Sequence, residues 1–164
     1  MSTVATNVTI IGGHGQVAMR LAALLASATS PSAYAVTPVI RNPDHAASLI
    51  DLPTVLPNTI TPLVLSLEDE PASAFTAAFI QSKADVVVFS AGANAEGERT
   101  KKVDYEGAVK IYDAIEGVVK QGGKAPRLIL VSALDVRDPE QIPSHYVRDA
   151  TSSVLRNEVE LSFL

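Results

Sequence analysis

Short apolar runs alternate with longer segments of helical spacing along most of the chain. The run Val86-Val87-Val88-Phe89 is rich in β-branched residues and carries no polar position. Such continuous apolar runs are typical of strands that are buried on both faces of a parallel sheet. The pattern predicts strands over residues 7–11, 34–40, 63–67, 86–89 and 127–131.

The segments between these runs have apolar residues three and four positions apart, which indicates amphipathic helices. They predict helices over residues 16–27, 71–81 and 99–120, and a short helix that starts at Pro43 after the N-cap Asn42. The face predicted for the first helix comprises Val17, Leu21, Leu24 and Leu25. The buried stripe predicted for the last helix comprises Val103, Gly107, Ile111, Ile115, Val118 and Val119.

This alternation predicts an α/β fold, a three-layer doubly wound (Rossmann) parallel sheet of about five strands. The expected strand order is 3-2-1-4-5, within a single domain over residues 1–164. A ligand should then lie at the carboxyl ends of the first and fourth strands, where the strand order reverses.

Clustered glycines follow the first strand at this position. Gly12 permits a tight turn, Gly15 lets the backbone approach a pyrophosphate, and Ala18 takes the third small position. The helix N-terminus that follows offers unpaired N–H groups to phosphates. The pattern favours dinucleotide binding over a purely structural turn. The predicted cofactor contacts in this turn are Gly12, Gly13, His14, Gly15, Gln16 and Val17; for His14 an exposed loop position competes with a hydrogen bond to phosphate.

Arg41 ends the second strand, where an enzyme that prefers NAD usually carries an acidic residue. A guanidinium suits a 2′-phosphate, which favours NADP (NADPH over NADH). The alternative is a solvated arginine beside a helix start.

Three further places near the carboxyl ends of the strands could contribute. Ala91 and Gly92 leave room for the adenosine half of the cofactor, or simply form a tight turn. Leu67 and Glu68 could border the adenine, although Glu68 also suits a helix start. Ser132, just past the fifth strand, is the catalytic candidate because its hydroxyl could bind a carbonyl oxygen; the alternative is a small polar residue that ends a strand.

Composition narrows the class of protein. The 164 residues carry 13 basic and 18 acidic side chains, a net charge of −5, and no basic cluster larger than Lys101-Lys102, which disfavours nucleic acid as a partner. The absence of cysteine excludes disulfides and thiolate chemistry, and three scattered histidines indicate no metal site. No signal peptide or membrane-spanning run is present, so we expect a cytoplasmic protein with no membrane partner.

The chain resembles the atypical short-chain dehydrogenase/reductase family, in its NAD(P)H-binding, flavin and biliverdin reductase-like (NmrA-like) branch, and in particular small fungal members. The matching segments are Gly12-Gly13-His14-Gly15-Gln16-Val17, Val39-Ile40-Arg41, residues 86–93, residues 103–107 and residues 130–133. The resemblance implies an NADP site built from the glycine turn, Arg41 and Ala91-Gly92. It also implies that Ser132 occupies the catalytic serine position of the family.

The chain departs from this family in two ways. Many members follow the serine with Tyr-x-x-x-Lys, but here Tyr146 is followed at that offset by Ala150, and the last lysine is Lys124. We also expect a truncated C-terminus that lacks the substrate lobe. The fifth strand would then form an open apolar edge, which predicts homo-oligomers.

Two functions follow as hypotheses. The first is an NADP-dependent oxidoreductase that reduces a small carbonyl or flavin-type acceptor. The second is a non-catalytic NADP-binding sensor or inactive remnant, which the missing Tyr-x-x-x-Lys pair favours. The sequence leaves the small-molecule substrate open.

Overall fold

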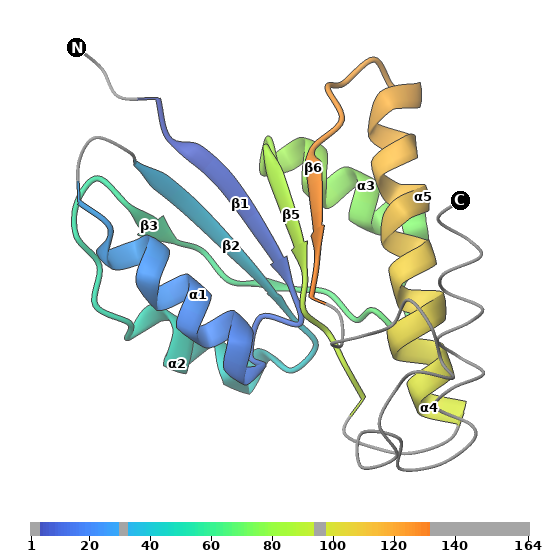
Figure 1. Ribbon diagram of the computed structural model, residues 1–164, viewed down its shortest axis with the longest axis horizontal. Coiled ribbons are helices and arrows are strands. Elements are labelled where there is room, and N and C mark those ends of the chain that lie inside the picture. Colours follow the sequence, from blue (N-terminus) through green and yellow to red (C-terminus); the bar gives the residue numbers. More distant parts are fainter. Residues whose placement is uncertain (1–3, 30–32, 94–97, 132–164) are drawn as a thin grey trace, which may run out of the picture.

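A single parallel sheet forms the centre of the molecule. The computed structural model describes residues 4–29, 33–93 and 98–131. Its strands are β1 (Thr6–Ile11), β2 (Tyr34–Ile40), β3 (Thr59–Ile60), β4 (Leu63–Val64), β5 (Val86–Phe89) and β6 (Arg127–Leu130). They lie in the order β3-β2-β1-β5-β6, and β4 also pairs with β2 (Figure 1). The predicted doubly wound order is therefore confirmed.

The helices lie close to their predicted positions. They are α1 (Gln16–Ser27), the 3₁₀ turn η1 (Pro43–His45), α2 (Ala46–Ile50), α3 (Ala72–Gln81), α4 (Glu98–Thr100), the π-helical turn η2 (Lys101–Tyr105) and α5 (Glu106–Lys120). The segment predicted as one long helix thus contains a π-helical turn near its start. Among the described residues, no helix combines the length and apolar character that crossing a membrane requires.

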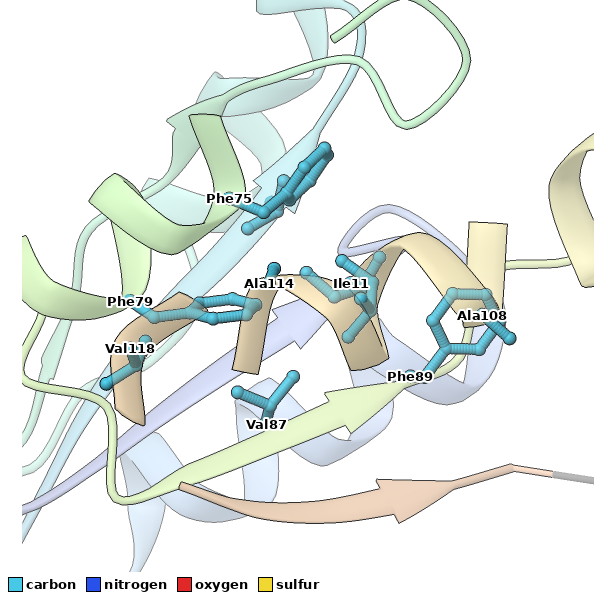
Figure 2. Packing of buried hydrophobic residues seen from close by; sticks show 10 residues of the cluster. Ile11, Phe75, Phe79, Val87, Phe89, Ala108, Ala114 and Val118 are labelled. Carbon is cyan, nitrogen blue, oxygen red and sulfur yellow. The ribbon is translucent and has the colours of Figure 1, made fainter. Parts of the chain in front are cut away.

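The two faces of the sheet are covered by different helices, which gives three layers. Ile11 and Phe89 face α3 and α5, where Phe75, Phe79 and Ile111 are buried with them (Figure 2). Val8, Ile10, Val36 and Val88 face the other side, where they pack against α1. Alternate residues of β1 therefore enter both cores, as a strand buried on both faces requires.

The buried face of α1 differs from the predicted one. Ala18, Ala22 and Ala26 are fully buried, whereas Val17 is 54% exposed and Leu24 is 69% exposed. The three alanines are four positions apart and form one stripe. Their small side chains let the helix axis approach the sheet closely, so the larger residues flank the contact or point to solvent.

The predicted stripe of the last helix is correct except at one end. Val103, Gly107, Ile111 and Val118 are buried, but Val119 is 51% exposed. Val118 and Val119 are adjacent on a helix, so they point about 100° apart, and only one of them can reach the sheet.

The third predicted strand, residues 63–67, is present only over β4, Leu63–Val64, and the sequence pattern did not predict the short strand β3 that precedes it. Val36 pairs with Ile60 and Ile40 pairs with Val64, so Pro38 and Pro62 stand opposite each other in the same register. The carbonyls of Val36 and Ile40 accept hydrogen bonds from this side. Residues 36, 38 and 40 face this neighbour, and Pro38 has no N–H to donate to it, so the ladder is interrupted between the two short strands.

Candidate functional site

The turn between β1 and α1 is packed against the carboxyl end of β5. Gly12 has a φ of 80°, and a Cβ there would lie 2.6 Å from the Ala91 Cα. No other residue type fits this position without displacing backbone atoms. The structure therefore brings together Gly12 and Ala91, two residues that sequence analysis assigned to the same site.

The same turn is also fixed to β2. The Gly13 N–H donates to the Val39 carbonyl oxygen at 2.8 Å, and a Cβ on Gly13 would lie 2.6 Å from the Pro38 Cβ. Gly13 is buried by this contact. Gly12 and Gly13 thus hold the turn between the ends of β5 and β2, over the point where the strand order reverses.

The start of α1 presents its backbone to solvent. Gly15 is the N-cap, it provides no side-chain cap, and the Met19 N–H makes the first hydrogen bond of the helix, to the Gly15 carbonyl oxygen. Gly15, Gln16 and Val17 are exposed. A helix start of this kind offers N–H groups and a partial positive charge to an anion. The residues present therefore fit a pyrophosphate group.

Ser90 stabilises the junction between β1 and β5. Both its backbone N–H and its hydroxyl donate to the Ile11 carbonyl oxygen, each at 3.0 Å. Ser90 therefore serves the turn structure. Beyond it, the Ala93 N–H donates to Asp104 Oδ1 of η2 at 2.8 Å, which ties this loop to the start of the long helix. Partial burial raises the pKa of Asp104, against the opposing effect of the Ala93 hydrogen bond.

Arg41 and Glu68, predicted separately, form an ion pair. Arg41 Nη1 lies 3.0 Å from Glu68 Oε1, and Arg99 Nη2 of α4 lies 3.0 Å from the same oxygen. The hydrogen bond from Arg99, together with the charges of both arginines, lowers the pKa of Glu68 below its ordinary value, against the opposing effect of partial burial. Glu68 is thus an ionised bridge between two guanidinium groups at neutral pH.

Leu67 is held by α5. Its side chain packs where a Cβ on Gly107 would stand, 2.7 Å from the Leu67 Cδ2, and its carbonyl oxygen accepts a hydrogen bond from Lys110 Nζ at 2.6 Å. These contacts fix the position of Glu68, the next residue.

His14 and His45 form a stacked pair. Their ring centroids are 3.7 Å apart and their planes differ by 13°. His14 is exposed, as expected, but the stack connects the glycine turn to η1, four residues after Arg41. The sequence predicts either a phosphate contact or an exposed loop position for His14, and it does not predict the contact with His45.

The candidate catalytic residue Ser132 lies outside the described residues, as do His145 and Tyr146. Gly92 lies in the loop after β5, and a Cβ there would be 3.9 Å from Asp104 Oδ1. Within residues 4–29, 33–93 and 98–131, no group of three His, Cys, Asp or Glu side chains could hold a metal ion.

The doubly wound sheet with its glycine turn defines the class as a Rossmann-type domain. Comparison with known proteins then gives the family: residues 12–159 match the NAD(P)H-binding family, and the chain belongs to it. The description of this family is NAD(P)H-binding, which agrees with the glycine turn at the start of α1.

Among curated proteins, the chain is 34% identical over 146 residues to the UPF0659 protein C216.03 of Schizosaccharomyces pombe. The match covers 84% of this chain but 50% of that protein, so the chain spans half the length of this relative.

Solved structures support the fold. A short-chain dehydrogenase/reductase from Mycobacterium ulcerans is 21% identical with a TM-score of 0.66, over 97% of this chain and 60% of that one. Carveol dehydrogenase from Mycobacterium avium, solved in complex with NAD, is 20% identical with a TM-score of 0.61, over 94% of this chain and 64% of that one. The family match and the fungal relative confirm the predicted likeness to NAD(P)H-binding proteins, and the solved structures confirm the predicted fold.

Two residues beside the candidate site could not be found from the sequence. The helical spacing predicts Arg99 as the first residue of a helix and leaves Asp104 off the buried stripe. In the structure Arg99 pairs with Glu68 and Asp104 accepts the Ala93 N–H, and helical spacing does not report partners in other loops.

Proposed function

We propose that this chain binds NADPH in preference to NADH and reduces a small carbonyl or flavin-type acceptor. The observation that carries the cofactor preference is Arg41, a basic residue at the end of β2 where a ribose-binding acid would favour NAD. The Gly13 N–H bonds the Val39 carbonyl oxygen of β2, two residues before Arg41, so the glycine turn lies against the end of the strand that Arg41 follows. NADP is a hydride donor when reduced and an acceptor when oxidised.

Each predicted residue has a part in this proposal. The N–H groups at the start of α1 would hold the pyrophosphate, with His14, Gln16 and Val17 around it. Ala91 and Gly92 would flank the adenosine half, and Leu67 and Glu68 would border the adenine. Ser132 would bind the carbonyl oxygen of the acceptor. We also propose that residues 1–164 form one domain.

A second candidate function is a non-catalytic NADP-binding module that senses the cofactor. The observation that favours it is Tyr146, which has Ala150 at the offset where many members of the family carry lysine. Without that lysine, a tyrosine general acid would lack the cation that lowers its pKa.

Calorimetric titration of wild type and Arg41→Ala with NADPH and NADH tests the cofactor proposal. We expect the wild type to bind NADPH more tightly, and Arg41→Ala to lose about tenfold or more of NADPH affinity with little change for NADH. Arg127→Ala removes the same charge at the start of β6, the opposite end of the sheet, and should change neither affinity. Equal binding of the two cofactors by wild type would contradict the preference.

Turnover separates the two candidate functions. NADPH oxidation with a panel of small aldehydes, ketones and flavins should proceed in wild type and fall on Ser132→Ala if the chain is a reductase. Tight NADPH binding without oxidation by any acceptor class would favour the sensor.

A further inference from the structure

One carboxylate oxygen joins three segments that are far apart in the sequence. Glu68 Oε1, in the turn after β4, accepts hydrogen bonds from Arg41 after β2 and from Arg99 in α4. Both distances are 3.0 Å. The two guanidinium groups are therefore held close to each other at the carboxyl end of the sheet, although neighbouring positive charges repel.

The cluster of Arg41, Glu68 and Arg99 has a net positive charge, and both arginines are accessible to solvent. Two guanidiniums and one carboxylate leave a charge of plus one. The Arg41 side chain is 57% exposed and the Arg99 side chain 40% exposed, whereas Glu68 is 23% exposed. A guanidinium has five N–H groups arranged as a planar fork, so a single hydrogen bond to Glu68 leaves further donors on each arginine.

Stability alone is a weak reason for this arrangement. Ion pairs between exposed side chains contribute little to stability, and here the second arginine adds repulsion to the first. A phosphate monoester matches the geometry better, because it carries close to two negative charges and three oxygens that can accept from both forks.

We infer that Arg99 is the second arginine of a 2′-phosphate site and that Glu68 is an internal anion that the phosphate displaces. This inference rests on the proposed NADPH preference and deepens it. Arg41 alone would favour the phosphate. Arg99 adds a second fork from α4, and Glu68 holds both forks in place until the ligand arrives. The Glu68 charge then opposes binding and limits the preference for NADPH.

Two nucleotides that differ by one group provide the test. Adenosine 2′,5′-bisphosphate carries the 2′-phosphate and 5′-AMP lacks it, so the ratio of their affinities reports on this group alone. We expect calorimetry to show about 10- to 100-fold weaker binding of the bisphosphate to Arg99→Ala, and 5′-AMP binding within about twofold of wild type. Arg99→Lys keeps the charge without the fork and should be intermediate.

The Glu68→Gln variant tests the displacement. Glutamine preserves the size and one acceptor oxygen but removes the charge, so we expect bisphosphate affinity to rise several-fold, with 5′-AMP unchanged. Glu116→Gln is the matched control, because Glu116 pairs with Lys120 on the exposed face of α5 at 2.9 Å. Arg127→Ala is the control for Arg99→Ala. Neither control should alter either affinity.

The outcomes separate this inference from the proposed function. Suppose that wild type prefers the bisphosphate, that Arg41→Ala removes this preference and that Arg99→Ala does not. The proposed NADPH preference then stands, and the inference that Arg99 belongs to the 2′-phosphate site is wrong. If Glu68→Gln weakens bisphosphate binding as Arg99→Ala does, Glu68 orders the site and is not displaced. A wild type that binds both nucleotides equally overturns both proposals.

Discussion

The carboxyl group of Asp104 lies in a place where burial disfavours its ionised form. It lies in η2 and accepts the Ala93 N–H at 2.8 Å, and burial raises its pKa above the ordinary value for aspartate. A raised pKa in the folded state means that folding favours the protonated form. The resulting stabilisation is present at pH values below the unfolded pKa and is lost as the pH rises through the folded pKa.

This sign predicts that Asp104→Asn is at least as stable as wild type at pH 7. The amide oxygen of asparagine still accepts the Ala93 N–H, and no charge has to be buried. Asp104→Ala leaves that N–H without its acceptor and should lose about 1 kcal/mol of unfolding free energy. Urea unfolding at pH 7 and at pH 4 measures the unfolding free energy of both variants. The difference in this free energy between Asp104→Asn and wild type should be smaller at pH 4. An Asp104→Asn protein as unstable as Asp104→Ala would contradict this account.

At the scale of elements, α1 shows that side-chain size decides which face meets the sheet. Its buried stripe is Ala18, Ala22 and Ala26, all with 0% exposure. Close approach of this helix keeps the glycine turn in contact with both β2 and β5. The packing of α1 therefore supports the site as well as the core.

A larger side chain in this alanine stripe should lower the unfolding free energy more than a smaller side chain on the exposed face of α1. We expect Ala22→Leu to lower the unfolding free energy by about 1–3 kcal/mol, because the added atoms push the helix away from β1 and β2. Leu24→Ala removes a side chain that is 69% exposed and should change it by about 0.5 kcal/mol or less. Thermal unfolding of both variants measures the difference; a larger loss for Leu24→Ala would mean that the predicted leucine face is the contacting one.

The sequence predicts those features of the fold and of the site that depend on residues close together along the chain. The apolar runs predicted the strand order, and the glycine spacing predicted a turn where Gly12 meets Ala91. The face of α1 could not be predicted, because alanines and leucines together make most of its circumference apolar. The meeting of Arg41 and Arg99 at Glu68 depends on partners 27 and 31 residues apart, which no local pattern reports. The roles of the cofactor-contacting residues and of Ser132 stay predictions.

At the scale of the whole molecule, the two edges of the sheet are formed by different kinds of strand. Within the described part of the chain, β6 is the last strand on its side, and Ile129 is 45% exposed. An apolar strand at such an edge can pair with another chain. The prediction of self-association therefore applies to β6.

We expect light scattering to show a mass that rises with protein concentration. Ile129→Lys should shift the equilibrium towards the monomer, because a lysine on an edge strand opposes strand pairing. Leu24→Lys makes the same kind of change on exposed α1 and should leave the mass unchanged. A wild type that stays monomeric at high concentration would contradict the prediction.

Pro38 of β2 and Pro62, which lies opposite it between β3 and β4, limit the growth of assemblies that form by strand pairing. Growth of an open-ended fibre needs two adhesive edges on each copy, so that every added copy offers a new one. Pro38 and Pro62 interrupt the ladder on one side, and β3 and β4 are only two residues long. Short, proline-broken edges are poor templates for a further strand. Association through β6 would then close as a twofold pair and stop, so these two prolines would protect the protein from forming fibrils.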